Sequence, residues 1–300
     1  MTDKTKSDLT ESEVSEDMTD EEVVQIAQHR ALSSLTVYEI VNLEGQEEIA
    51  RPAKSLWWSA ISAGFGISSS VLSEGILHHV FEDHPYRFAI ENLGYTVGFI
   101  LVILCRMQLF TENTITVVLP LLKRRNQEVF LCVARLWAIV FAGNMVGSLA
   151  AATLYEFGGV IPPHLLDGSY YVARHFAENT AMEAFRYGIP AGFLIAAVVW
   201  MLPSSEGFEF WVIMLFTYLI AMGDFTHVIA GSHEAFLLLL TGEITLAKTV
   251  LGLILPSLAG NVLGGTGLFA LLAYGQVVAE MEQRDPASSA YAPRKRKAGR

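Results

Sequence analysis

The stretch WVIMLFTYLIAMGDFTHVIAGSHEAFLLLL, from Trp211 to Leu240, determines the fold. It forms most of an apolar segment over residues 208–240, which is more than 30 residues long. A helix needs only about 20 residues to cross the hydrocarbon core of a membrane. Asp224 and His227 also place polar groups near the centre of the segment. A long segment with a polar centre favours a broken helix whose halves meet inside the membrane.

Further apolar stretches of spanning length lie on both sides of this segment. They cover 55–79, 91–122, 128–155, 181–203 and 246–277. The stretch 91–122 is again longer than one span needs and is polar near its middle, so we expect a second broken helix there. We therefore predict an all-α membrane protein with six transmembrane helices, of which the second and the fifth are broken.

The composition supports a membrane protein. Of 300 residues, 52% are apolar and only 17% are charged, against about 25% charged residues in soluble domains. Most of the formal net charge of −11 lies in the first 50 residues, before the apolar stretches begin. No long basic patch is present, so nucleic acid is not predicted as a ligand.

The two ends of the chain differ from the apolar region. Residues 1–18 are polar and are expected to be disordered. The Thr19-Asp-Glu-Glu22 motif has the form of a capping box and precedes apolar residues at helical spacing up to Leu35. We assign 19–50 to a cytoplasmic amphipathic helix and linker, 51–278 to the six-helix channel domain and 279–300 to a basic cytoplasmic tail. The helix is expected to pack on the cytoplasmic side; a gating role is the alternative.

Basic residues in the connections predict the orientation. An even number of spans places both termini on one side, and the clusters Arg51 with Lys54, 123–125 and 294–297 all fall on that side. The opposite connections, 80–90 and 156–180, contain only Arg87 and Arg174 as Lys or Arg. We therefore predict a multi-pass protein of the cell inner membrane with both termini cytoplasmic.

Two similar motifs indicate an internal repeat. Gly143-Asn144-Met-Val-Gly147 resembles Gly260-Asn261-Val-Leu-Gly264 at an offset of 117 residues. The same offset carries Phe110-Thr111, in the second stretch, onto His227-Val228, in the fifth. Two three-helix halves with matched interruptions are typical of inverted-repeat transporters and channels. For Asn144, Gly147, Asn261 and Gly264 we expect a structural role in close helix packing.

His227 is the strongest candidate for a functional residue, next to Thr226. An ionisable side chain at membrane depth usually faces a cavity or a partner, and histidine exchanges protons near neutral pH. A buried neutral histidine with a structural hydrogen bond is the alternative. Its position at the helix break favours the functional interpretation.

The loop at the other break is the second candidate site. Its candidate residues are Arg106, Gln108, Leu109, Phe110, Thr111, Glu112 and Asn113. Arg106 either raises the local anion concentration or forms an ion pair with Glu112, because buried charges are normally paired. Thr111 is expected to donate a hydrogen bond to the other broken helix.

The sequence predicts no enzyme, cofactor or metal site. It contains no Gly-x-Ser-x-Gly, phosphate-binding loop or dinucleotide fingerprint, and His233-Glu234 lacks the second histidine of a metalloprotease motif. A zinc site at His78, His79 and His84 is conceivable, but a solvated loop is the preferred interpretation.

With these motifs the region of about residues 50–278 resembles the formate/nitrite transporter family. The resemblance rests on Tyr95-Thr-Val-Gly98, Gln108-Leu-Phe-Thr111, Gly143-Asn144, Val199-Trp-Met201, Phe225-Thr-His227 and Gly260-Asn261 in this order. It implies an aquaporin-like six-helix protomer in a homopentamer, each protomer with its own pore for a small monovalent anion such as formate, nitrite, hydrosulfide or lactate, often with a proton.

The resemblance also assigns positions in the pore. His227 matches the central histidine and Thr111 its hydrogen-bond partner. Leu109 and Phe110 match the loop at the outer constriction, and Tyr95, Phe99 and Ile220 fall where the inner constriction is lined. The chain departs from the family at Gln108 and Thr226, which replace acidic residues, at Phe176, near a vestibule lysine, at Gly192, where an asparagine is usual, and at Arg106, where a small residue is common.

We therefore expect a pore in which two apolar constrictions flank His227 and protonation neutralises the anion, which would otherwise have a high desolvation cost. A pore for a small neutral solute, and a membrane scaffold without transport, are the alternatives.

Overall fold

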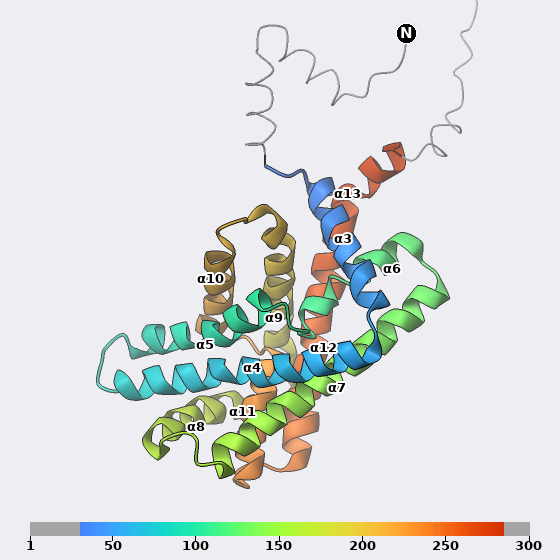
Figure 1. Cartoon of the computed structure of the whole chain (residues 1–300). Coiled ribbons are helices and arrows are strands. Elements are labelled where there is room, and N and C mark those ends of the chain that lie inside the picture. Colours follow the sequence, from blue (N-terminus) through green and yellow to red (C-terminus); the bar gives the residue numbers. More distant parts are fainter. Residues whose placement is uncertain (1–30, 285–300) are drawn as a thin grey trace, which may run out of the picture. The chain divides into compact units, whose positions relative to one another are not determined.

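The computed structural model describes residues 31–284, which are helical with short connections and contain no β-strand (Figure 1). The helices of the first half are α3 (Ser34–Ala50), α4 (Ala53–Val80), α5 (Arg87–Leu104), the 3-10 turn η1 (Glu112–Thr114), α6 (Val118–Arg124) and α7 (Gln127–Phe157). Those of the second half are α8 (Pro163–Ala177), α9 (Ala181–Met201), η2 (Leu202–Ser204), α10 (Glu209–Met222) and α11 (Val228–Leu240). A last continuous segment contains π-helical η3 (Lys248–Ile254), α12 (Leu255–Val262), π-helical η4 (Leu263–Ala270) and α13 (Leu271–Arg284).

Five helical segments are long and apolar enough to cross a membrane: Ala53–Val80, Arg87–Leu104, Gln127–Phe157, Ala181–Ser204 and Lys248–Gln283. Two shorter apolar helices, α10 and α11, divide the stretch that contains His227. The stretch 91–122 is likewise divided into α5, η1 and α6. The stretches 91–122 and 208–240 are therefore each interrupted where their polar residues lie.

Both interruptions begin with the same backbone turn. Arg106 and Asp224 have φ angles of 52° and 51°, in the left-handed region that residues other than glycine rarely adopt. The next amide bonds back five residues: Met107 N–H donates to Val102 O and Phe225 N–H to Ile220 O, both at 3.0 Å. This arrangement satisfies carbonyls at a helix end and terminates the helix. The backbone of Arg106 therefore ends α5, a role that its charge does not reveal.

Helix α3 differs from the predicted linker. Most of the predicted amphipathic helix, from Thr19, lies outside the described residues, and the segment assigned to the linker is helical from Ser34 to Ala50. Its buried face includes Tyr38 and Val41 and packs against α6 and α13 (Figure 1). Gly45 allows close approach, because a Cβ atom there would lie 2.0 Å from Thr116 O. Burial of the apolar side chains of this segment stabilises the packed helix relative to a solvated linker.

Candidate functional site

The two interrupted segments meet at a hydrogen bond between side chains. Thr111 Oγ1 and His227 Nε2 are 2.7 Å apart, although 116 residues separate them in the chain. Thr111 is fully buried and His227 is 2% exposed. The structure therefore brings together His227 and the residue that the family resemblance assigned as its hydrogen-bond partner.

His227 is also the N-cap of α11. It has extended backbone angles, and its Nδ1 accepts a hydrogen bond from Ala230 N–H at 3.3 Å. An acceptor nitrogen carries no proton, so the proton of a neutral ring is on Nε2. His227 Nε2–H then donates to Thr111 Oγ1. The direction is opposite to the expected one, in which Thr111 donated.

Two buried asparagines hold the interrupted segments by the same set of bonds. Asn144 Oδ1 accepts from Phe110 N–H at 2.9 Å, and its Nδ2 donates to Gln108 O and Ala60 O at 2.8 Å. Asn261 Oδ1 accepts from Val228 N–H at 2.9 Å, and its Nδ2 donates to Thr226 O at 2.8 Å and to Gly188 O at 2.9 Å. Each carboxamide therefore satisfies backbone groups that the helix break leaves free.

Glycines allow these contacts to form. A Cβ atom on Gly64 would lie 2.1 Å from Asn144 O, and one on Gly192 would lie 2.2 Å from Asn261 O. Gly147 and Gly264 are equally close to a neighbouring helix, at 2.1 Å from Ile61 O and 2.0 Å from Ile189 O. The backbone of Asn261 leaves no room for an asparagine side chain at Gly192.

One cavity lies beside α8 and reaches His227; we call it the α8-side cavity. Its volume is about 410 Å³. Of the predicted site residues, Tyr95, Thr226 and His227 line it. The Thr226 hydroxyl donates a hydrogen bond from Oγ1 to Ala184 O at 2.6 Å, so its proton is already engaged. Phe176 packs against Gly231 on the same wall.

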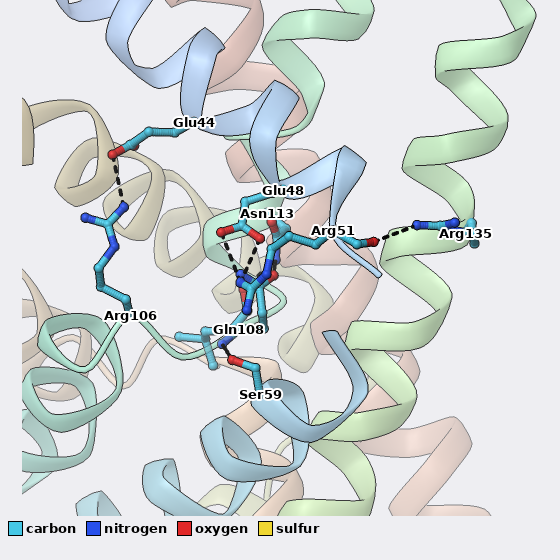
Figure 2. Close-up of polar contacts among 9 residues, drawn as sticks. Glu44, Glu48, Arg51, Ser59, Arg106, Gln108, Asn113 and Arg135 are labelled. Carbon is cyan, nitrogen blue, oxygen red and sulfur yellow. Dashed lines mark hydrogen bonds and ion pairs between the residues drawn. The ribbon is translucent and has the colours of Figure 1, made fainter. Parts of the chain in front are cut away.

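A second cavity, of about 400 Å³, lies beside α3; we call it the α3-side cavity. Its lining includes Glu44 and Glu48 of α3 and the predicted loop residues Arg106, Gln108, Glu112 and Asn113. Figure 2 shows the polar contacts at this end. Gln108 N–H donates to Ser59 Oγ at 3.1 Å, and Asn113 Nδ2 donates to Gln108 Oε1 at 3.1 Å.

Arg106 forms an ion pair with Glu44 and not with Glu112, the partner considered from the sequence. Its guanidinium lies 3.3 Å from Glu44 of α3, and its side chain is 80% exposed (Figure 2). The ion pair with Glu112 is therefore not formed. Because α5 ends at Leu104 and the chain turns at Arg106, the side chain points toward α3 and water, away from the membrane interior that the apolar run suggested.

The two cavities share no lining residue, and buried apolar side chains adjoin the residues that line them. Phe99, Leu109 and Ile220 are fully buried and Phe110 is 3% exposed. The Phe99 ring meets the His227 ring edge-on, with 4.8 Å between centroids. We call Phe99, Leu109, Phe110 and Ile220 the apolar barrier.

The predicted sides of the two constrictions do not agree with the predicted orientation of the termini. We expected Tyr95 on the inner side and Leu109 on the outer side, with α3 and the basic connections inside. The structure places Tyr95 in the α8-side cavity, and it places Gln108, the neighbour of Leu109, in the α3-side cavity. The reason is the direction of α5, which begins near α8 and ends near α3.

Several carboxylates of the α8-side cavity were not among the predicted site residues. Glu74, Glu91 and Glu234 line it and are 8%, 6% and 5% exposed. They lie on three different helices, so no motif joins them. The rule that ionisable residues within apolar stretches mark functional sites would have selected Glu74 and Glu234.

Comparison with known proteins identifies the family. The family model "Formate/nitrite transporter" matches residues 35–275, which is most of the chain. The chain belongs to this family. This family consists of membrane channels and transporters and not of enzymes.

Three relatives illustrate the match. The inner membrane protein YfdC of Escherichia coli (strain K12) is 38% identical over 256 residues, which is 85% of this chain and 83% of that protein. A pentameric formate channel solved with formate bound is 23% identical, with a TM-score of 0.63 over 76% of this chain and 98% of that one. A channel described as an FNT family ion channel is 20% identical, with a TM-score of 0.64 over 81% of this chain and 96% of that one.

Proposed function

We propose that this member of the formate/nitrite transporter family passes small monovalent anions together with a proton, with His227 at the centre of its pore. The observation that carries the proposal is the Thr111–His227 hydrogen bond, which lies at the apolar barrier between two cavities. The solved relative with formate bound supports an anion of this size.

We propose further that the chain spans the cell inner membrane six times, as two inverted three-helix repeats over residues 51–278 with an aquaporin-like arrangement. The matched contacts of Asn144 and Asn261, and of the turns at Arg106 and Asp224, support the repeat. Both termini would be cytoplasmic, and five copies would form a homopentamer, as in the solved pentameric relative.

In this mechanism the anion needs a proton because it loses its hydration at the apolar barrier. A bare anion at the Phe99–Leu109 barrier would lose its hydration without a cation to replace it, whereas the neutral conjugate acid crosses apolar surroundings at far lower cost. His227 Nε2–H offers the solute one hydrogen bond when Thr111 yields it. Formate and nitrite, as anions of weak acids, can use this route, but chloride cannot.

The test is uptake of radiolabelled formate into proteoliposomes that contain the purified full-length protein. We compare His227→Asn with wild type, because an asparagine keeps an N-cap acceptor for α11 but has no titratable group. Uptake driven by a pH gradient should fall about tenfold. His84→Asn, in an exposed turn, is the control and should retain wild-type uptake. Undiminished uptake by His227→Asn would contradict the central role of His227.

The same vesicles test the alternatives. Urea uptake above that of empty vesicles, without formate uptake, would assign a neutral solute. Uptake of neither solute would favour a scaffold.

A further inference from the structure

Six carboxyl side chains line the α8-side cavity, and four of them have partners. Glu91 lies 2.7 Å from His78 Nδ1 and 3.6 Å from Arg87. Asp224 and Glu178 lie 3.1 and 3.8 Å from the two ring nitrogens of His175. Glu183 accepts hydrogen bonds from Thr180 N–H and Oγ1 in a capping box.

The remaining two, Glu74 of α4 and Glu234 of α11, have no hydrogen bond or ion pair among the described residues. They are also two of the most buried of the six, at 8% and 5% exposure. Both line the cavity wall that includes His227. Their carboxyl groups therefore face the space through which a solute would approach His227.

Among the residues that the structure describes, no Lys or Arg lines the cavity around this pair. On the packed helices, Arg87 is paired with Glu91, Arg174 with Glu243, and Lys248 with the carbonyl of Asn179. The imidazoles are engaged too: His175 with carboxylates, His227 with Ala230 and Thr111, and His233 with Ser148 O. The other titratable groups on the wall are the phenols of Tyr95, Tyr171 and Tyr187.

A carboxylate buried without a cation or a donor is costly, whereas the neutral carboxylic acid is tolerated and gains a hydrogen-bond donor. An ionised pair would also repel the anions that relatives carry. A protonated pair has the opposite effect, because its two O–H groups can donate to the oxygens of an arriving anion.

We propose that Glu74 and Glu234 form a proton-donating site that receives a weak-acid anion in the α8-side cavity and neutralises it before it reaches the apolar barrier. This inference rests on the proposed function and assigns the proton to a site other than His227. His227 is then a fixed hydrogen-bond donor past which the neutral acid moves.

The transfer is balanced in atoms and charge. The O–H bond of one glutamic acid breaks, and an O–H bond forms on the anion, which leaves as the neutral acid. The glutamate becomes a carboxylate, and the second glutamic acid keeps its proton. Water in the open cavity returns a proton and restores the starting state. Each cycle moves one anion and one proton in the same direction.

The first experiment detects the protonated carboxyl groups without any transport. Infrared spectra of the full-length protein in nanodiscs at pH 7 should show the C=O stretching band of protonated carboxyl groups. This band should weaken in Glu74→Gln and Glu234→Gln and weaken most in the double variant. Its absence from wild type would overturn the proposal. Its loss on addition of K⁺ or ammonium would also overturn it, because a cation site would then be indicated.

The second experiment is formate uptake into proteoliposomes driven by a proton gradient. The double variant should lose about tenfold or more of the wild-type rate. Glu178→Gln is the matched control, since Glu178 lines the same cavity but its side chain is 79% exposed. An unchanged rate in the double variant would overturn this proposal and leave the proposed function intact. A wild type without formate uptake would instead refute the proposed function itself.

Discussion

At the scale of single residues, Asn144 and Asn261 determine where the chain can leave a helix inside the membrane. Each carboxamide bonds to two backbone carbonyls and one backbone N–H from two different segments. If the carboxamide is removed, the backbone groups that it bonds have no water at this depth to replace it. Loss of the side chain therefore destabilises the fold. The loop and the adjacent helices are therefore stabilised together.

We predict that Asn144→Ala and Asn261→Ala each lower the free energy of unfolding by about 3 kcal/mol or more, because each leaves several buried backbone groups unsatisfied. Thermal unfolding in mild detergent measures the change. Asn126→Ala is the control, since Asn126 caps the exposed start of α7 and its loss should cost only about 1 kcal/mol. Equal effects at all three positions would contradict the assigned role.

At the scale of elements, the two interrupted segments are built alike but are not related by one offset. The motif asparagines are 117 residues apart, whereas Arg106 and Asp224, and also Phe110 and Val228, are 118 apart. Gly64 and Gly192, which approach the asparagines from the first helix of each half, differ by 128. The first half is longer because of its helices: α4 and α5 have 28 and 18 residues, whereas α9 and α10 have 21 and 14.

Helix α8 is attached to the turn after α11 by an exposed ion pair outside the candidate spans. Arg174 donates two hydrogen bonds of 2.7 Å to Glu243. These bonds lower the pKa of the Glu243 carboxyl from its usual 4.5. The pair therefore stabilises the fold above the unfolded-state pKa, and this contribution disappears as the pH falls through the lower pKa of the folded state.

We predict that Glu243→Gln lowers the Tm by about 2 °C or less at pH 7, as expected for an exposed pair. The difference from wild type should shrink progressively once the pH falls below 4.5. Thermal scans of both proteins at several pH values measure it. Glu178→Gln serves as control, and a difference between wild type and Glu243→Gln that grows in acid would have the wrong sign.

At the scale of the whole molecule, apolar side chains remain exposed along helices that the bilayer or other copies must cover. On α7 they include Phe130, Leu131, Val146 and Leu149, and on the last segment Leu251, Leu255, Leu263 and Leu271. Only 28% of the spanning window is buried in each of these two segments. Lipid tails and neighbouring protomers can both satisfy such surfaces.

We predict that the protein extracted in mild detergent has the mass of five chains. Native mass spectrometry measures this mass directly. The monomer that harsher detergent releases provides the reference mass in the same instrument. A single chain, or an assembly of another order under mild conditions, would contradict the proposed homopentamer.

Hydropathy predicted an all-helical membrane protein with interruptions in the stretches 91–122 and 208–240, and the family resemblance predicted that Thr111 is the partner of His227. Five helical segments are long and apolar enough to cross a membrane, whereas six spans were predicted. The sequence did not predict the turns at Arg106 and Asp224, since the left-handed conformation is normally a glycine position and Gly223 lies beside one of them. The carboxyl pair Glu74 and Glu234 was missed for another reason: only the packing of α4 with α11 brings these residues to one wall.

The two hydrogen bonds of His227 have a mechanical consequence. A half-turn of the ring about its Cβ–Cγ bond would put carbon atoms where Nδ1 and Nε2 now face Ala230 and Thr111. Both bonds would be lost, and the first turn of α11 would lose its cap. The two hydrogen bonds therefore hold the imidazole in one orientation, and its rotation is coupled to the capping of α11.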